Sequence, residues 1–131
     1  MSAFAQTALG RHVLADLHGV DEHLLNDTAS IEAVLNRAAL TAGATPILSK
    51  FHHFGEGQGV TGVLLLRESH ISIHTWPEFG FAAVDAFMCG SARPDLAINI
   101  VQMALRPERC EIRKIERGEH VSASADMAKT A

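Results

Sequence analysis

Residues 68–90 gather several side chains that can take part in covalent chemistry. The segment reads ESHISIHTWPEFGFAAVDAFMCG and contains a hydroxyl in Ser69, imidazoles in His70 and His74, and a thiol in Cys89. A hydroxyl or thiol close to an acid–base group is the usual composition of a covalent catalytic site. This segment is therefore the main candidate for the functional site.

The eight histidines raise the hypothesis of a metal site, which their spacing does not favour. His70 and His74 would lie about 13 Å apart on a strand that rises roughly 3.3 Å per residue. His52 and His53 are neighbours and would point to opposite faces of a strand. We therefore predict no metal site.

A serine hydrolase is the second alternative, with Ser69, a histidine and Asp85 as its candidate triad. The sequence has no G-x-S-x-G motif, and it does not predict the doubly wound sheet that carries such a nucleophile. The hydrolase hypothesis therefore has little support.

The elements around this segment predict an α+β fold. Apolar alternation and turn residues indicate strands over residues 12–19, 44–54, 59–67, 70–76, 81–89 and 110–118. Helical periodicity predicts one helix that starts at Asn26, Asp27 or Thr28 and stops at Gly43, and another over residues 91–105 with Pro94 in its first turn. This order indicates a two-layer sandwich, a mostly antiparallel sheet with both helices packed on one face. The opposite face would then be free to bind a second copy of the chain.

Length and composition limit the possible functions. The 131 residues, of which 47% are hydrophobic, are typical of a single domain, 1–131, whose tail over 119–131 we expect to be flexible. A net charge of −4 without a basic run does not favour a nucleic-acid partner. The apolar runs are too short to cross a membrane, and we expect a cytoplasmic protein because it has only two cysteines and no export-type start.

The segment 68–90 closely resembles the signature of the short bacterial and archaeal S-adenosylmethionine decarboxylase proenzymes. The resemblance continues through GRHVLADLHGVD (residues 10–21) and FHHFGEGQGVTG (residues 51–62), so that it covers roughly the first hundred residues. It implies a pyruvoyl-dependent enzyme that converts S-adenosylmethionine to its decarboxylated form and CO2, and so supplies aminopropyl groups for spermidine synthesis.

The resemblance also implies that the chain cuts itself at Glu68-Ser69, which would give chains of residues 1–68 and 69–131. Ser69 would become a covalent pyruvoyl group, the enzyme's cofactor. The implied roles are His74 as the base in cleavage, Thr61 as a supporting hydroxyl where serine is usual, and Cys89 as the proton donor in turnover. Strict alternation would put Ser69 and His74 on opposite faces, so we expect a turn or bulge at Glu68-Ser69 that changes the parity.

Three further residues are expected to bind the substrate. A sulfonium cation, an adenine and a ribose diol call for an aromatic face and a carboxylate acceptor, which Trp76 and Glu78 could supply. The resemblance implies that Glu78 binds the ribose hydroxyls and that a phenylalanine, Phe54 in this sequence, stacks on the adenine. The link after Phe54 looks one residue longer than the family pattern.

Two alternatives remain. The same pyruvoyl chemistry could serve an arginine or ornithine decarboxylase, because the choice of substrate depends on the binding residues and not on Ser69. The chain could also be a non-catalytic subunit that does not cleave, although Glu68, Ser69, His74 and Cys89 are all present. We expect a homodimer of cleaved protomers in the enzymatic cases.

Overall fold

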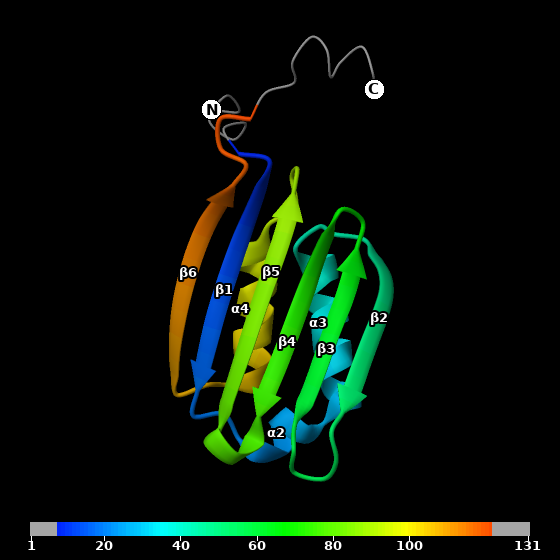
Figure 1. Ribbon diagram of the computed structural model, residues 1–131, viewed down its shortest axis with the longest axis vertical. Helices are drawn as coiled ribbons and strands as arrows, with labels where there is room; N and C mark the ends of the chain where they lie inside the picture. Colours follow the sequence, from blue (N-terminus) through cyan, green and yellow to red (C-terminus); the bar gives the residue numbers. More distant parts are fainter. Residues whose placement is uncertain (1–7, 122–131) are drawn as a thin grey trace.

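The computed structural model describes residues 8–121, which form a sheet and a layer of helices on one of its faces (Figure 1). The strands are β1 (Gly10–His18), β2 (Pro46–His53), β3 (Val60–Leu66), β4 (Ser69–Trp76), β5 (Phe81–Cys89) and β6 (Arg109–Arg117). The helices are α2 (Glu22–Asn26), α3 (Thr28–Thr41) and α4 (Pro94–Leu105), and a 3-10 turn, η1, spans Pro77–Phe79. The predicted α+β sandwich is confirmed.

The strand order is β2-β3-β4-β5-β1-β6, and each neighbouring pair is antiparallel. Strands β2 to β5 follow one another as hairpins, whereas β1 lies between β5 and β6 (Figure 1). The first strand of the chain is thus held between two strands from its second half.

The hydrophobic core lies between the sheet and the helices. Alternate residues of the central strands are buried, as in β4, where Ile71, Ile73 and Thr75 are inaccessible and the residues between them are not. The facing side chains on α3 and α4 recur with helical spacing; they include Ile31, Leu35, Ala38, Ala97, Ile98 and Val101. The predicted strand alternation and the predicted spacing in α3 describe the core correctly. In α4 the sequence places Leu96, Ile100 and Met103 on the packing face, and this prediction was wrong for Met103, which is 73% exposed, because the residues that face the sheet are Ala97, Ile98 and Val101.

Both ends of α3 follow from local sequence signals. The Asp27 carboxylate accepts a hydrogen bond from the backbone N–H of Ser30, so Asp27 is the N-cap among the three candidates. The chain leaves the helix at Gly43, which has a left-handed φ of 87°. The short helix α2, by contrast, was not predicted, because five residues are too few to show a helical period.

A two-residue turn, Arg67 and Glu68, joins β3 to β4. Its ends are fixed, because Leu66 pairs directly with Ser69. Glu68 has a φ of 64°, a left-handed conformation that costs a residue other than glycine about 1 kcal/mol. The sheet on either side of this turn holds the strained residue in place.

The other face of the sheet carries no covering element within residues 8–121 (Figure 1). We call it the open face; it presents the alternate residues of each strand, among them His12, Thr61, His70, His74 and Asp85. None of the described helices is long and apolar enough to cross a membrane. The tail expected to be flexible lies mostly outside the described residues.

Candidate active site

Ser69 and Cys89 lie together at one end of the sheet. Ser69 opens β4 directly after the strained turn, and Cys89 is the last residue of β5. The Cys89 thiol lies 3.4 Å from the carbonyl oxygen of Glu68, to which it can donate a weak hydrogen bond. The thiol therefore contacts the carbonyl group of the bond that the sequence predicts to be cleaved.

A cavity of about 240 Å³ opens beside this contact. Its walls come from the turn 67–69, from the segment 43–45 after α3, and from residues 89–92 between β5 and α4. The backbone N–H of Arg93 donates to the carbonyl of Ala42, which joins two of these walls. We call this group, Glu68, Ser69 and Cys89 with their cavity, the cleavage end.

A second group of the predicted residues lies toward the other end of the sheet. Thr61 and His74 face each other on β3 and β4, and the Thr61 hydroxyl lies 3.1 Å from Nδ1 of His74. The ring of Trp76 is 6.3 Å from that of His74 and 40% of Trp76 is exposed. Glu78 follows in the exposed part of η1.

Phe54 belongs to this second group as well. It follows β2, is 53% exposed, and packs its ring 4.6 Å from that of His52. Its backbone N–H donates to the carbonyl of Gly59, which closes the loop before β3. We call Phe54, Thr61, His74, Trp76 and Glu78 the binding end.

The two groups do not meet within one chain. Ser69 and His74 are five positions apart on an extended strand, a separation of about 17 Å. The expected bulge is absent: β3 and β4 pair without a shift from Leu66 and Ser69 to Thr61 and His74. The turn at Glu68 is present, but the parity is unchanged, so Ser69 and His74 lie on opposite faces and that expectation was wrong.

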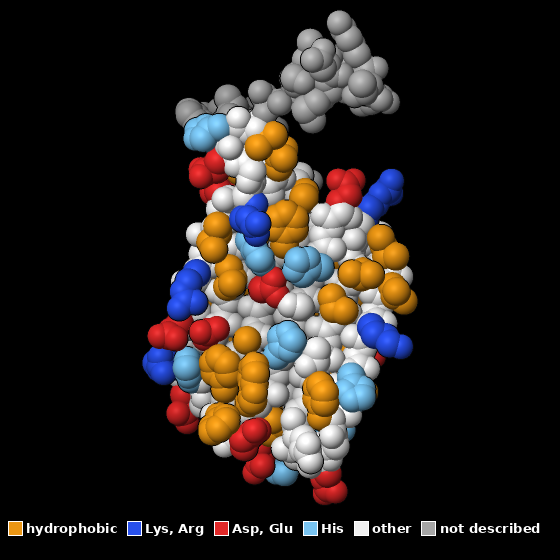
Figure 2. Space-filling model, in the orientation of Figure 1, with side chains coloured by type: hydrophobic (Ala, Val, Ile, Leu, Met, Phe, Trp, Pro, Cys, Tyr) orange, Lys and Arg blue, Asp and Glu red, His pale blue; other side chains and the backbone are white. Residues whose placement is uncertain are grey.

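A network that the sequence did not reveal occupies the open face between the two ends. Asp85 lies at its centre; its Oδ2 atom is 2.6 Å from Nε2 of His12 and 3.1 Å from Nε2 of His70. The Ser72 hydroxyl donates to the other oxygen of Asp85. Figure 2 shows this face, with imidazole groups gathered around an acidic side chain.

The network keeps Asp85 ionised. Burial raises the pKa of Asp85, but hydrogen bonds from Ser72, His12 and His70 outweigh the burial, and the pKa lies below its ordinary value. Strand alternation in the sequence is enough to predict that His70 and Ser72 lie on the same face of their strand. The contact of His12 with Asp85 depends on β1 lying beside β5, which the order of elements along the chain does not reveal.

His12, His70 and Asp85 are also close enough to bind a metal ion, since their ligand atoms all lie within 4.8 Å of one another. The Arg117 guanidinium lies 3.2 Å from Nδ1 of His12 and can only donate to it. The proton of His12 is then on Nε2, where it is donated to Asp85. This arrangement favours a hydrogen-bond network over a metal site.

Comparison with known proteins gives a consistent result. The profile of the S-adenosylmethionine decarboxylase family matches residues 11–118. An S-adenosylmethionine decarboxylase proenzyme of Methanococcus maripaludis is 47% identical over 111 residues, which cover 84% of this chain and 90% of the relative. One from Caldanaerobacter subterraneus subsp. tengcongensis is 43% identical over 112 residues, 85% of this chain and 90% of that protein.

A solved structure agrees with these sequence matches. The crystal structure of the adenosylmethionine decarboxylase from Aquifex aeolicus superimposes with a TM-score of 0.79 at 40% identity. The match covers 90% of this chain and 99% of the other.

Proposed function

The chain belongs to the S-adenosylmethionine decarboxylase family, and on that basis we propose that it cleaves itself between Glu68 and Ser69 and then decarboxylates S-adenosylmethionine at the new chain end. The products are decarboxylated S-adenosylmethionine, the aminopropyl donor for spermidine synthesis, and CO2. One observation carries the proposal for the site: the Cys89 thiol lies 3.4 Å from the Glu68 carbonyl oxygen, beside Ser69 in the same cavity.

Cleavage would start at the strained turn. Ser69 Oγ attacks the carbonyl carbon of Glu68, which converts the peptide bond to an ester. Removal of the Ser69 α-proton expels the Glu68 carboxylate, and hydrolysis then releases ammonia and leaves the pyruvoyl group. The left-handed φ of Glu68 supports this site, because cleavage relieves the strain.

The cavity at the cleavage end fits the group that forms there. Ser69 is the first residue of β4, so the hydrogen bonds of the strand would keep the new chain end beside Cys89. The pyruvoyl group supplies an electron sink for decarboxylation, the role that pyridoxal phosphate has in other enzymes. Cys89 would donate the proton that the substrate's α-carbon needs after CO2 has left.

His74 and Thr61 can assist only if a second copy of the chain supplies them, because about 17 Å of strand separates His74 from Ser69 in one protomer. We propose a homodimer in which two open faces pack together about a two-fold axis roughly perpendicular to the strands. Such an axis brings the binding end of one copy to the open-face side of the other copy's cleavage end, where Cys89 contacts the Glu68 carbonyl. The Ser69 side chain lies on the helix side of β4, so His74 of the second copy would act on the backbone at Ser69, where the α-proton is removed. The two Asp85 networks would then lie near the axis.

The same dimer would complete the substrate site. Trp76 and Phe54 offer exposed aromatic faces for the sulfonium cation and the adenine, and Glu78 offers a carboxylate for the ribose diol. A basic amino acid would instead need carboxylates around its side-chain cation. We also propose a cytoplasmic location, which the free thiols of Cys89 and Cys110 support.

An intact-mass spectrum of the freshly purified protein, together with a CO2-release assay, tests this function. We expect two chains, 1–68 and 69–131, the second blocked to Edman sequencing and lighter by one ammonia than a serine-ended peptide. Ser69→Ala should remain a single inactive chain, and its cleavage at the same bond would refute the mechanism. CO2 should be released faster from S-adenosylmethionine than from arginine or ornithine at equal concentrations, and the reverse order would refute the substrate.

A further inference from the structure

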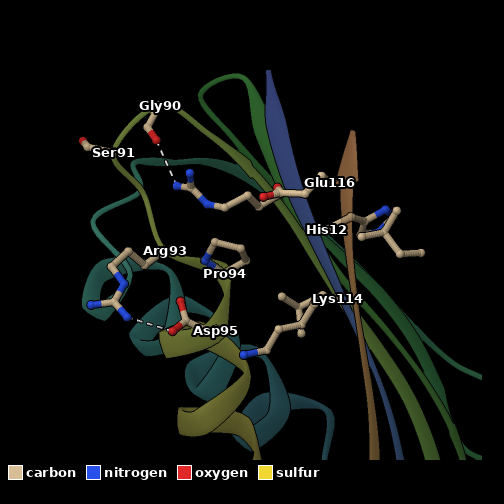
Figure 3. Close-up of a pocket in the computed structure, with 11 residues that line it drawn as sticks. His12, Gly90, Ser91, Arg93, Pro94, Asp95, Lys114 and Glu116 are labelled. Atoms are coloured by element: carbon tan, nitrogen blue, oxygen red, sulfur yellow. Dashed lines mark hydrogen bonds and ion pairs between the residues drawn. The ribbon is translucent and has the colours of Figure 1, made fainter. Parts of the chain in front are cut away.

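A second cavity, of about 560 Å³, lies behind the cleavage end, between the start of α4 and the strands β1 and β6 (Figure 3). Residues 90–91 and 93–95 form one side of it, and Lys114 and Glu116 of β6 form part of the other. Arg11 of β1 also lines this cavity. Arg11 belongs neither to the hydrophobic core, nor to the open face, nor to the binding end, so its role needs another explanation.

Arg11 holds the segment that follows Cys89. Its Nη2 atom donates to the carbonyl oxygen of Gly90 at 2.9 Å and to that of Ala92 at 2.5 Å. Figure 3 marks the first of these hydrogen bonds with a dashed line. Within residues 8–121 neither carbonyl accepts a hydrogen bond from another side chain or from a loop N–H.

Residues 90–92 separate the two cavities. They form a wall of the cavity that contains Glu68, Ser69 and Cys89, and Gly90 and Arg93 line the cavity behind it. The wall begins with a sharp turn, since Gly90 has a φ of 64° and the N–H of Ala92 donates back to the carbonyl of Cys89 at 3.3 Å. One guanidinium thus holds two carbonyls of the turn that directly follows the thiol.

We propose that Arg11 is a positioning residue, which holds the turn 90–92 so that the Cys89 thiol stays against the cleavage end. This inference rests on the proposed role of Cys89. A charged donor binds a carbonyl more strongly than a neutral one does, and the planar guanidinium fixes the direction of its hydrogen bonds. Without the guanidinium, the carbonyls of Gly90 and Ala92 would hydrogen-bond to water, and the turn 90–92 would no longer be held rigidly.

The neighbouring arginine supplies a matched control. Arg93 lines the same cavity, but its side chain pairs with Asp95 at 2.9 Å and contacts neither carbonyl. Arg93→Gln removes the same charge from the same cavity as Arg11→Gln does. A general effect of charge would therefore appear in both variants, whereas a positioning effect would appear only in Arg11→Gln.

The first test measures the thiol without any turnover. In the uncleaved Ser69→Ala, Cys110→Ser chain, the rate at which iodoacetamide alkylates Cys89 is measured across pH. Throughout this pH range, we expect Arg11→Gln to raise the alkylation rate several-fold, Arg93→Gln to leave it unchanged, and Arg11→Lys to restore part of the protection. Equal rates in the two glutamine variants would overturn the proposal, as would a failure of Arg11→Lys to differ from Arg11→Gln.

The second test uses the protein that is able to cleave. Arg11→Gln should lower kcat about 10-fold, equivalent to about 1.4 kcal/mol, with little change in KM. The second chain should also gain amino-terminal alanine faster, because protonation at the wrong carbon leaves the amine on the enzyme. If the parent protein neither cleaves nor releases CO2, the proposed function fails. If the parent is active, and Arg11→Gln has the same kcat and the same rate of alanine formation as Arg93→Gln, only the proposed role of Arg11 is refuted.

Discussion

Cys89 and Cys110 have the same side chain in different surroundings. Cys110 pairs with Leu17 on β1, and burial together with the charges of Asp16 and Glu111 raises the pKa of its thiol. Cys89 instead contacts the carbonyl of the strained Glu68 beside a cavity. Of the two, only Cys89 is placed to act on a group held at the cleavage end.

Cys89→Ala should separate cleavage from turnover. Ser69 and the Glu68 carbonyl are unchanged in this variant, so the chain should still cut itself. Decarboxylation should fall by about 100-fold or more, the scale of a lost proton donor, and amino-terminal alanine should accumulate on the second chain. Mass spectrometry and CO2 release measure the two steps, with Cys110→Ala as the control. If Cys89→Ala decarboxylated the substrate at the parent rate, Cys89 would not be the proton donor and would serve only in packing.

Asp85→Asn should destabilise the fold in a pH-dependent manner. The pKa of Asp85 is lower in the folded chain than its ordinary value of 3.8, so its carboxylate stabilises the fold above about pH 4 and the contribution is lost as the pH falls below that. We expect Asp85→Asn to lower the free energy of unfolding by about 1 kcal/mol at pH 7, and by progressively less as the pH falls below about 4. Urea unfolding of the uncleaved Ser69→Ala chain at a fixed concentration measures it.

Asp16→Asn is the matched control for Asp85. Asp16 lies on the open face of β1, and no hydrogen bond to its side chain is found in residues 8–121. Asp16→Asn should lower the free energy of unfolding at pH 7 by less than Asp85→Asn does. An equal decrease in the free energy of unfolding of both variants at pH 7 would show that the network around Asp85 does not stabilise the fold.

At the scale of elements, Thr75 connects α2, β3 and β4. Its buried hydroxyl donates to the carbonyl of Leu25 and accepts from the N–H of Val60, both at 2.8 Å. Thr75→Val keeps the shape but leaves both partners unpaired, which should cost about 1–3 kcal/mol. The exposed Thr41→Val at the end of α3 is the control. A similar urea midpoint for the two variants would show that this connection contributes nothing.

The elements were more predictable than the contacts between them. Alternation in residues 70–76 correctly separated the buried Ile71 and Ile73 from the chemically active side chains. The contact of His12 with Asp85 could not be predicted, because it joins strands 73 positions apart in the chain. The distance between Ser69 and His74 follows from the strand itself, but only the unshifted register rules out a bulge.

At the scale of the molecule, the split site predicts complementation between two inactive chains. His74→Ala and Ser69→Ala should each cleave poorly or not at all alone. In a mixed dimer, the His74→Ala chain keeps Ser69 and Cys89 and can receive His74 from the Ser69→Ala copy. Co-expression should therefore restore cleavage of the His74→Ala chain only, as mass spectrometry of the separated chains would show.

An independent measurement tests the interface itself. Val63 lies near the middle of β3 on the open face, opposite Ser72 of β4, so Val63→Arg should shift the sedimentation coefficient toward the monomer and reduce cleavage. Leu40→Arg, on the exposed side of α3, should do neither. Full cleavage in a monomeric Val63→Arg protein would exclude a shared site, as would the absence of complementation.

The position of β1 between β5 and β6 has a consequence for the life of the protein after cleavage. The proposed cut would leave β1, β2 and β3 on one chain and β4, β5 and β6 on the other, and the two sets interleave along the sheet. Each fragment would keep only one hairpin, β2-β3 or β4-β5, whereas β1 and β6 pair only with strands of the other fragment, so we expect the fold to be complete before the bond breaks. After such a cut, the protein would regain its structure only if two separate polypeptides met again, so unfolding that the uncut chain reverses would become practically irreversible.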